Sequence, residues 1–212
     1  MTGEQYKELS IREFTAAAKR YEGNHAGVYA LCRKDYPDIL EELEKEDFYN
    51  LLDAGCGPAP MISLLSEKYP EKHYTGLDLT PLMIETAREK QIPNAEFVVG
   101  DCEDMPFAAE SFDAVICSMS FHHYPDPLAF FREVRRCLKP GGRLILRDMT
   151  GPDWVVWLMN HLEMPLAHLS GHGDYRGYTL ADIRVLGEQA GLKPEKVEHR
   201  KGFRLHAVLR KP

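Results

Sequence analysis

The sequence predicts an α/β protein with a mostly parallel sheet that helices cover on both faces. Between residues 49 and 149, short apolar runs alternate with amphipathic stretches long enough to be helices. Such alternation implies right-handed crossovers between parallel strands. Runs such as "AVIC" (114–117) and "LIL" (144–146) are continuously apolar, as expected of strands that are buried on both faces.

The first 47 residues are expected to form a helical cap. Residues 11–34 have a helical pattern with a break at 22–24, and the apolar residues of 37–46 have helical spacing. A cofactor-binding core would follow over residues 48–150.

Five strands are predicted in this core, separated by helices. The strands are 49–55, 73–79, 95–101, 112–120 and 143–149. The helices are Pro58 to about Tyr69, 80–91 with Thr80 as N-cap and Pro81 in the first turn, and 127–138, which "KPGG" ends.

The chain closes with a helix and two strands. Residues 179–191 form an amphipathic pattern that ends in a glycine cap, and 193–212 resemble a hairpin around Gly202. At this length we expect residues 1–212 to form one domain.

The composition limits the classes of function. The 212 residues are 44% hydrophobic and 28% charged, with a formal net charge of -7. This acidic balance argues against a protein that mainly grips nucleic-acid phosphates. No apolar run is long enough to cross a bilayer, and the first residues lack the apolar core of a signal peptide, so a cytoplasmic location is expected.

The cysteines are scattered, odd in number and free of CxxC spacing. They are Cys32, Cys56, Cys102, Cys117 and Cys137. The pattern indicates neither a disulfide framework nor a structural zinc site. We expect small buried hydrophobes rather than nucleophiles.

The stretch "DAGCGPAP" (53–60) follows the first predicted strand. Gly55 and Gly57 let the backbone pass close to a ligand, and the next helix points its N–H groups into the same space. Pro60 occupies the last glycine slot of a dinucleotide GxGxxG turn, and prolines lack the N–H that a pyrophosphate would bind. Asp53 would repel phosphate and attract an ammonium group. The turn therefore suits a ligand with a nucleoside part and a positive charge.

Each of three successive strand ends presents an aspartate. After Asp53, Asp78 follows Gly55 by 23 residues, at a place where a carboxylate can accept the hydroxyl protons of a ribose. Asp101 ends the third strand, where it could accept from an adenine amino group while Cys102 packs against the ring, together with Met105. Because ligands of open α/β sheets bind beyond the carboxyl ends of the strands, one site is expected here.

These residues also carry a family resemblance. Four stretches of this chain resemble the successive motifs of class I S-adenosylmethionine-dependent methyltransferases. They are "LLDAGCGPAP", "YTGLDLTPLMIETAR", "FVVGDCEDMPFAAESFDAVICSMSFHHYPDP" and "REVRRCLKPGGRLIL". The chain is similar to the branch typified by ubiquinone and menaquinone biosynthesis C-methyltransferases. The resemblance covers about residues 48–150. In one departure, Ala59 replaces the third glycine of the family's DxGxGxG turn.

The resemblance implies a Rossmann-like, doubly wound sheet of seven mostly parallel strands with an antiparallel last strand. It implies S-adenosylmethionine as cofactor and S-adenosylhomocysteine as product. Gly55 and Gly57 would contact the methionine end and Asp78 the ribose, while Asp101 and Cys102 would contact the adenine. The predicted cofactor-binding residues are Tyr21, Asp53, Gly55, Cys56, Gly57, Asp78, Leu79, Met83, Asp101, Cys102, Glu103, Ser118 and His123.

His122 and His123 lie in "FHHY", just past the fourth strand, and are the predicted catalytic residues. Histidine titrates near neutrality and could accept a proton from a hydroxyl, amine or carbon acid. Alternatively, both histidines only pack the loop, and catalysis rests on aligning donor and acceptor. His123 is the better candidate for contact with the cofactor. The resemblance also implies that Ser118, at the end of the fourth strand, lies near the sulfonium methyl and the amino group.

Residues 151–178 form an insertion that in this fold usually covers the acceptor site. Trp154, Trp157 and Met164 either wall an apolar acceptor pocket or form the core face of one helix; the sequence leaves both open. A small-molecule acceptor is expected, but its identity cannot be read from these residues.

The N-terminal segment around Phe14 and Tyr21 is expected to form the other wall of the site. The insertion also holds His161, His168 and His172, whose spacing matches no standard set of metal ligands, so no metal is expected. Either a monomer or a homodimer is expected.

Three other functions would fit parts of this sequence pattern. A nonenzymatic cofactor-binding or regulatory protein would keep the same turn. A dehydrogenase is disfavoured by Pro60 and Asp53. Nucleic-acid methylation is disfavoured by the acidic charge and because "SMSFHHYPD" stands where an Asn/Asp-Pro-Pro-aromatic motif would be.

Overall fold

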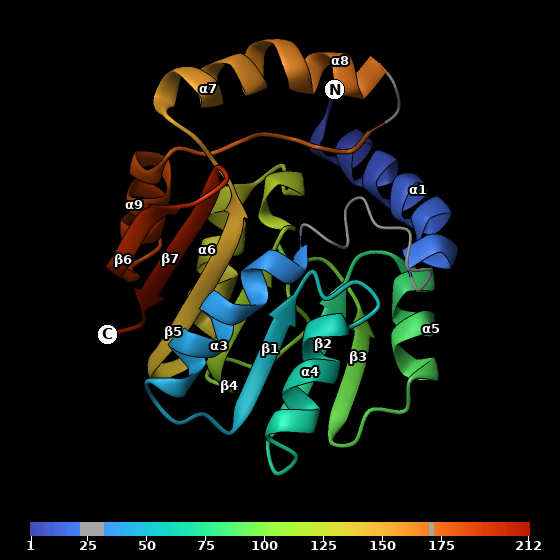
Figure 1. Cartoon of the computed structure of the whole chain (residues 1–212), viewed down its shortest axis with the longest axis vertical. Helices are drawn as coiled ribbons and strands as arrows, with labels where there is room; N and C mark the ends of the chain where they lie inside the picture. The colour runs from blue at the N-terminus through green and yellow to red at the C-terminus, as the bar shows by residue number, and fades with distance from the viewer. Residues whose placement is uncertain (22–31, 170–171) are drawn as a thin grey trace.

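The computed structural model describes residues 1–21, 32–169 and 172–212, and a seven-stranded sheet lies at its centre (Figure 1). The strands are β1 (Asn50–Ala54), β2 (His73–Asp78), β3 (Ala95–Val99), β4 (Phe112–Ser118), β5 (Leu138–Met149), β6 (Lys193–Arg200) and β7 (Arg204–Arg210). Their order in the sheet is β3-β2-β1-β4-β5-β7-β6. The pairs from β3 to β5 are parallel, and β7 is antiparallel to both of its neighbours. The predicted mostly parallel sheet with an antiparallel last strand is confirmed.

The strand order reverses at β1. From β1 the chain moves outward through β2 to β3 and then returns to β4 on the other side of β1. Such a reversal in an open α/β sheet leaves a crevice beyond the carboxyl ends of the two central strands, and ligands bind there. The fold therefore places the ends of β1 and β4 at a ligand site.

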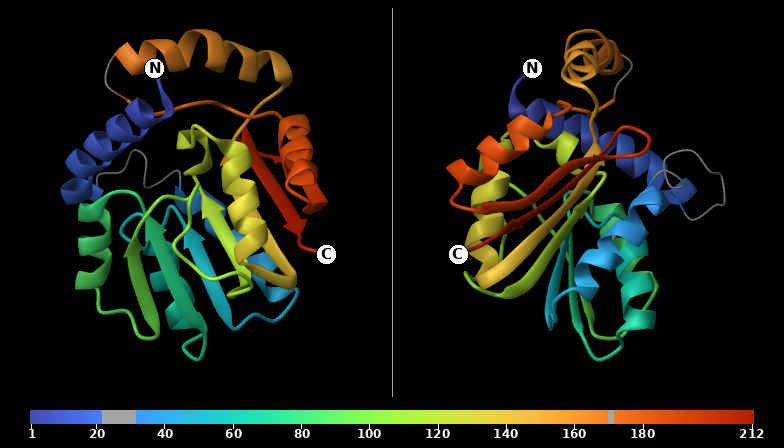
Figure 2. Two further views of the ribbon diagram at one scale, coloured as in Figure 1. Left: turned by 180° about the vertical axis from the view of Figure 1, so that it is seen from behind. Right: turned by 60° about the vertical axis from the view of Figure 1, so that its left-hand side comes forward.

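Helices cover both faces of the sheet, as predicted (Figure 2). They are α3 (Tyr36–Glu44), α4 (Pro60–Lys68), α5 (Pro81–Glu89), α6 (Pro127–Cys137) and α9 (Leu180–Gln189). Side chains of α3, α4 and α5 pack in one buried cluster with Leu51, whereas those of α6 and α9 pack in another with Leu52. Leu51 and Leu52 are neighbours on β1, so the alternation of side chains along a strand assigns the two clusters to opposite faces.

Two helical segments lie beyond the carboxyl ends of the parallel strands (Figure 1). One is α1 (Gly3–Tyr21), and the other is the continuous run of α7 (Asp153–Leu158), the π-helical η3 (Met159–Glu163) and α8 (Met164–Leu169). Two short 3-10 helices, η1 (Arg33–Asp35) and η2 (Phe121–His123), precede α3 and follow β4. The predicted break at 22–24 lies outside the described residues.

The first helix begins eight residues earlier than predicted, at Gly3 rather than residue 11. Thr2 and Gln5 explain the difference. The Thr2 N–H donates to the Gln5 side-chain oxygen at 2.8 Å, and the Gln5 N–H donates to the Thr2 hydroxyl at 3.4 Å. This is the reciprocal pairing of a capping box, a start signal that the sequence carries.

Two further boundaries differ from the prediction. Helix α4 begins at Pro60 rather than Pro58, because Ala59 adopts the left-handed conformation with φ of 57°. Strand β5 begins at Leu138, so that the "KPGG" stretch lies within it rather than before it. There the Gly141 N–H donates to the Lys211 carbonyl, and the Lys211 N–H donates to the Gly142 carbonyl, both at 2.9 Å.

The C-terminal elements match the prediction. Thr179 and Asp182 form a capping box at the start of α9, and Gly191 beyond its end has a φ of 80°. The hairpin of β6 and β7 turns around Gly202, whose φ is 79°.

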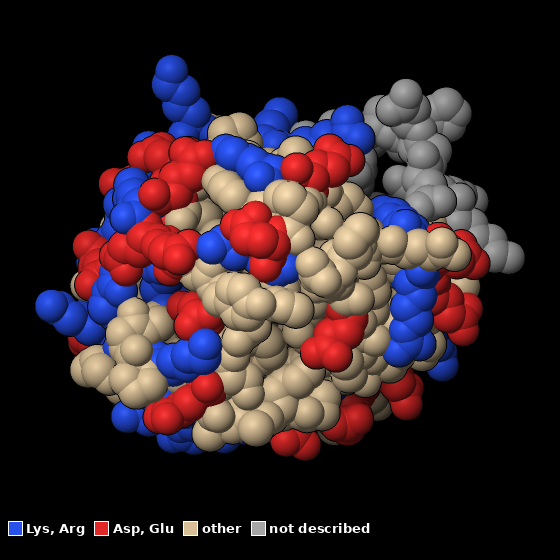
Figure 3. All heavy atoms as spheres, turned by 90° about the horizontal axis from the view of Figure 1, so that it is seen from below, with Lys and Arg blue, Asp and Glu red and all other residues tan. Residues whose placement is uncertain are grey.

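The surface carries charges of both signs. On the face seen from below in Figure 3, Lys and Arg side chains are interspersed with Asp and Glu. Among the described helices, none combines the length and the apolar character needed to span a bilayer.

A buried ion cluster joins η1, at the start of α3, to the neighbouring strands β5 and β7. Asp35 is fully buried, and its Oδ1 accepts hydrogen bonds from Arg147 of β5 at 2.9 and 3.1 Å and from Arg204 of β7 at 3.1 Å. Arg147 also contacts Asp38 at 2.9 Å. Two guanidinium groups thus depend on one carboxylate that water does not reach.

Asp35→Asn is expected to lower the free energy of unfolding by about 3–5 kcal/mol, because it removes the charge that compensates buried arginines. Asp47 is the matched control, since it pairs with Lys72 at 2.7 Å but its side chain is 89% exposed. Asp47→Asn should leave the urea midpoint unchanged. Equal effects of the two changes in urea denaturation would contradict the importance of the cluster.

Candidate active site

The turn between β1 and α4 has the backbone shape that the sequence predicted. Gly55 and Gly57 have φ of 77° and 53°, a region that favours glycine. The N–H groups of Gly55 and Cys56 both donate to the Leu77 carbonyl, at 2.8 and 3.0 Å. Ala59 shares the left-handed conformation, at a cost of about 1–2 kcal/mol, and stands where the family resemblance expects a third glycine.

Asp78 connects this turn to the end of β2. Its Oδ2 accepts from the Gly57 N–H at 2.9 Å, and its Oδ1 accepts from the Thr80 N–H at 2.8 Å. Burial raises the pKa of Asp78, and these two hydrogen bonds oppose that rise. The carboxylate therefore shapes the glycine turn in addition to any contact with a ligand.

Asp53 ends β1 beside Asp78 and is 4% exposed. Burial, followed by the charge of Asp78, raises the pKa of Asp53 to about 7. A nearby ammonium group would reverse this shift, because an opposite charge favours the ionised carboxyl. The raised pKa of the Asp53 carboxyl therefore agrees with the predicted attraction of this turn for a cation.

A pocket opens over the turn, and the space inside it, counted together with adjoining open solvent, is about 620 Å³. Seven of the predicted cofactor residues line it: Asp53, Gly55, Cys56, Gly57, Asp78, Met83 and Ser118. A second pocket of about 470 Å³ is lined by the predicted residues Gly55, Asp78, Leu79, Cys102 and His123. The pockets share Phe14, Gly55, Asp78 and Ser120, so they are two lobes of one site.

Phe14 lines both lobes, as expected for a wall formed by the N-terminal segment. Tyr21 is the last residue of α1, but its side chain lies outside the described part of the structure. The predicted role of Tyr21 stays a prediction.

Asp101 and Glu103 line neither lobe. The Lys7 ammonium of α1 lies 2.6 Å from Asp101 Oδ2 and 2.6 Å from Glu103 Oε2, so both carboxylates are engaged by the N-terminal helix. The structure thereby ties α1 to the end of β3, and contact of Asp101 or Glu103 with a cofactor stays a prediction.

Serine side chains occupy the end of β4. Ser118 Oγ is buried without a hydrogen-bond partner among the described residues and faces a lobe that Ser118 lines. Ser120 Oγ lies 2.7 Å from Tyr124 Oη above Gly55. Neither Ser120 nor Tyr124 was singled out from the sequence, because nothing in the local pattern shows that η2 folds back over the glycine turn.

The role of His122 as a general base stays a prediction, and its surroundings do not favour that role. Its Nδ1 lies 2.6 Å from Asp148 Oδ1, its Nε2 lies 3.4 Å from Asp174 Oδ1, and the ring lines neither lobe. Although burial lowers the pKa of His122, the two carboxylates raise it to about 10. A histidine that keeps its proton and has no open path to a substrate is unsuited to accept a proton from it.

His123 lies differently. It lines the second lobe, its side chain is 10% exposed, and its Nδ1 has no hydrogen-bond partner among the described residues. Burial and the neighbouring His122 lower the pKa of His123 to about 4, so the ring is neutral at neutral pH. Of the two histidines, only His123 reaches the pocket.

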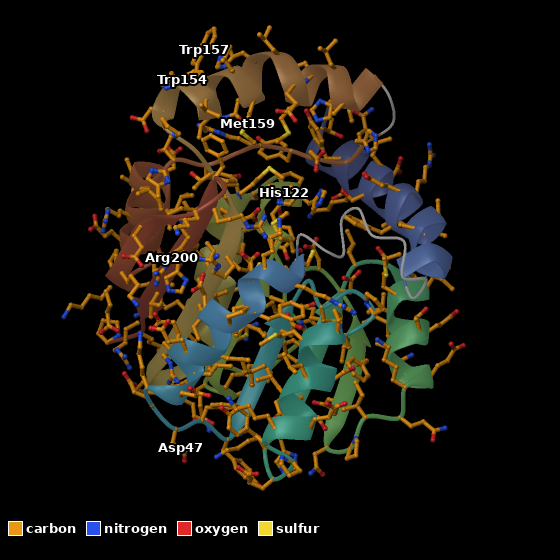
Figure 4. The ribbon with its side chains drawn as sticks, in the orientation of Figure 1. Asp47, His122, Trp154, Trp157, Met159 and Arg200 are labelled. Atoms are coloured by element: carbon orange, nitrogen blue, oxygen red, sulfur yellow. The ribbon has the colours of Figure 1, made fainter. Side chains whose placement is uncertain are left out.

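Both interpretations of the tryptophans are wrong. Trp154 and Trp157 are 67% and 56% exposed, and they point away from the body of the protein (Figure 4). Met164, in contrast, is buried, and Met159 points inward toward the loop that holds His122. The helical run of the insertion thus turns methionines, not tryptophans, toward the body of the protein.

The remaining side chains of interest have separate partners. His161 pairs with the Trp157 carbonyl, His168 with the Asp174 carbonyl, and His172 with Glu13.

The buried cysteines are Cys56, Cys102, Cys117 and Cys137. Burial raises the pKa of each of these four thiols, which confirms their interpretation as inert hydrophobes.

Comparisons with known proteins agree with this geometry. The model of the methyltransferase domain family matches residues 52–146. A demethylmenaquinone methyltransferase of Thermotoga maritima is 32% identical over 155 residues, which make up 71% of this chain and 66% of the relative. The chain spans between 45% and 66% of the length of the first curated relatives that it matches.

Solved structures share the fold. The 1,6-didemethyltoxoflavin-N1-methyltransferase of Burkholderia thailandensis, with bound 1,6-didemethyltoxoflavin and S-adenosylhomocysteine, has a TM-score of 0.73 at 17% identity and covers 100% of this chain and 91% of its own. A SAM-dependent methyltransferase of Aquifex aeolicus has a TM-score of 0.65 at 19% identity, over 84% and 90% of the two chains. Residues 52–146 carry the methyltransferase domain, and with its glycine turn, strand-end carboxylates and strand order the chain is similar to class I S-adenosylmethionine-dependent methyltransferases, among them demethylmenaquinone methyltransferases.

Proposed function

We propose that this protein transfers a methyl group from S-adenosylmethionine to a small-molecule acceptor. The observation that carries the proposal is the buried Asp53 carboxyl, which lies with Asp78 and two left-handed glycines in one pocket at the switch point of the sheet. A dinucleotide would bring phosphates against these carboxylates. A sulfonium nucleoside that carries an ammonium group brings positive charge instead.

The chemistry asks little of the protein beyond alignment. A lone pair of the acceptor forms a bond to the methyl carbon while the carbon–sulfur bond breaks, and its electrons remain on sulfur as neutral S-adenosylhomocysteine. Because the donor loses its positive charge, the step needs a closed, well-oriented site more than a strong base.

The two lobes suggest how the donor would lie. Asp53 and Ser118 would bind the amino group of the methionine end, and Asp78 would accept from the ribose hydroxyls. Leu79 and Cys102, in the second lobe, would contact the adenine ring. The unpartnered Ser118 hydroxyl supports this orientation, since a buried polar atom without a partner costs about 1–3 kcal/mol unless a ligand satisfies it.

The acceptor would enter between η2 and the insertion. His123 is the histidine that borders the open lobe there, and Met164 adds apolar surface nearby. The relatives named above are named for methylation of demethylmenaquinone and of 1,6-didemethyltoxoflavin, neither of which is a protein or a nucleic acid. We propose a small-molecule acceptor for this chain as well.

Gly55→Ala is expected to weaken binding of S-adenosylhomocysteine at least about tenfold, or about 1.4 kcal/mol, whereas Gly141→Ala should not. Both glycines have φ of 77°, so both variants carry the same backbone strain. A Cβ at Gly55 would overlap the Ser120 hydroxyl and lie 2.8 Å from Tyr124 Oη, whereas a Cβ at Gly141 meets nothing within 4 Å.

Calorimetric titration of variants with native circular dichroism measures this difference. NAD, titrated in parallel, should not bind. Normal affinity in a folded Gly55→Ala protein would remove the turn from the cofactor site.

The affinity for S-adenosylmethionine is expected to rise between about pH 6 and pH 8, as Asp53 loses its proton. The pKa of Asp53 is raised to about 7 by burial and by Asp78, and a bound ammonium group lowers it again. Binding near the lower end of this range should therefore release a proton. Calorimetry in two buffers of different ionisation enthalpy measures that release, and Asp53→Asn should abolish it. Proton release that persists in Asp53→Asn would assign the titration to another group.

Transfer itself is tested with S-adenosylmethionine that carries a trideuterated methyl group. Incubated with a metabolite extract, the wild-type protein should produce at least one compound heavier by the labelled methyl group, and Gly55→Ala should not. Cofactor binding without any labelled product across a broad acceptor library would favour a nonenzymatic binding protein.

A further inference from the structure

Three potential ligand atoms converge beside the second lobe. His122 Nε2 lies 3.4 Å from Asp174 Oδ1, and His123 Nδ1 lies 3.5 Å from the same oxygen. One ligand atom from each of the three residues lies within 4.8 Å of the other two. The two histidines belong to η2, and the aspartate follows the helical run of the insertion.

The two separations from the Asp174 oxygen match those of neighbouring ligands in a coordination sphere. Metal bonds of about 2.0–2.2 Å to nitrogen and oxygen place neighbouring tetrahedral ligands about 3.3–3.6 Å apart. Two imidazoles and one carboxylate are typical ligands of zinc and other divalent transition metals, whereas magnesium and calcium prefer oxygen.

Asp148 orients the first of these ligands. Its Oδ1 lies 2.6 Å from His122 Nδ1, and its Oδ2 accepts from the His122 backbone N–H at 3.0 Å. A metal ion would displace the Nε2 proton of His122 to solvent, and with Nδ1–H donated to Asp148 the freed Nε2 lone pair would point at Asp174. This carboxylate–histidine pairing is the outer-sphere arrangement that fixes most metal-bound histidines.

A second, independent observation that indicates a metal site is the Nδ1 of His123, which is unpartnered in the described part of the chain. Its Nδ1 is buried and, among the described residues, accepts no hydrogen bond, although a carboxylate oxygen lies 3.5 Å away. In the tautomer with the proton on Nε2, the Nδ1 lone pair faces this carboxylate and is repelled by it, and a cation between the two atoms would convert the repulsion into attraction. The edge of the Phe14 ring, at a centroid distance of 5.0 Å, packs against the imidazole.

The backbone holds the third ligand in place. The N–H groups of Tyr175 and Arg176 both donate to the His122 carbonyl, at 2.8 and 3.1 Å. Asp174 is thus fixed next to η2 without the metal, and binding would require little rearrangement.

We propose that His122, His123 and Asp174 bind one divalent transition-metal ion, with zinc as the representative, at the boundary between the cofactor lobe and the insertion. His123 lines the second lobe with Ser120 and Tyr124, so a remaining coordination position would face that lobe. Neutral histidines together with Asp148 and Asp174 would balance the two positive charges of the ion.

A role for the ion in catalysis rests on the proposed function. An acceptor hydroxyl or enol oxygen bound at the open position would have a lowered pKa and would release its proton to solvent before it attacks the methyl carbon. Metal binding itself does not depend on methyl transfer and can be measured alone.

The test is a calorimetric titration of chelator-treated full-length protein with zinc chloride, without cofactor or acceptor. The wild-type protein should bind one zinc ion per chain. His123→Gln and Asp174→Asn, which keep the side-chain size, should each bind zinc at least about tenfold more weakly, since even outer-sphere changes cost 10–100-fold. His161→Gln is the control, because it removes an exposed histidine of the same insertion. Magnesium should not compete.

No saturable zinc binding by the wild-type protein would overturn the proposal, as would ligand variants that bind like the wild type. An equal loss in His161→Gln would identify adventitious surface binding and overturn it too. Should a ligand variant fail to fold by circular dichroism, the visible spectrum of the cobalt-loaded wild type decides: bands of four-coordinate, histidine-bound cobalt support the site, and their absence overturns it. S-adenosylhomocysteine titrated into the same samples separates failure of the metal site from failure of the proposed function.

Discussion

The Asp78 carboxylate holds together the two strand ends on which the site is built. By accepting the N–H groups of Gly57 and Thr80, it fixes the glycine turn after β1 against the turn after β2. Both lobes of the pocket are lined by Asp78, so their shapes depend on this one side chain. Because its oxygens are already used by backbone donors, the carboxylate stays in position whether or not a ribose is present.

The same arrangement concentrates negative charge where water is excluded. Asp53 is buried and Asp78 is half-buried, and among the described residues no arginine is paired with either of them as Arg147 and Arg204 are with Asp35. At Asp35 the protein supplies its own cations and gains a fixed join between α3 and the sheet. At Asp53 no arginine opposes the effect of burial, and the pKa rises to about 7, which leaves the compensation to a ligand and favours positive charge in the site.

Much of this was predictable from the sequence. The spacing of apolar residues and the positions of glycine and proline predicted the parallel core strands, the helices on both faces and the closing hairpin. They did so because burying one face of a regular helix or strand requires apolar residues at a regular spacing. The glycine turn and the aspartates at the strand ends were also predictable, since the topology of an open α/β sheet brings those ends together. Errors were local: the Thr2–Gln5 cap and the bulged start of β5 shifted element boundaries by five to eight residues.

Tertiary structure decided which partners the ionisable side chains around the strand ends have. His122 and His123 are adjacent in sequence, yet only Asp148 and Asp174, 26 and 52 residues away, make one a buried ion-pair partner and leave the other open to the pocket. Likewise, Lys7 reaches Asp101, and the tryptophans of the insertion face outward. Sequence alone determined the fold and the strand-end residues because their signals are periodic and local. The partners of each charge come from distant segments, and only the packing of those segments sets the distances on which their electrostatic interactions depend.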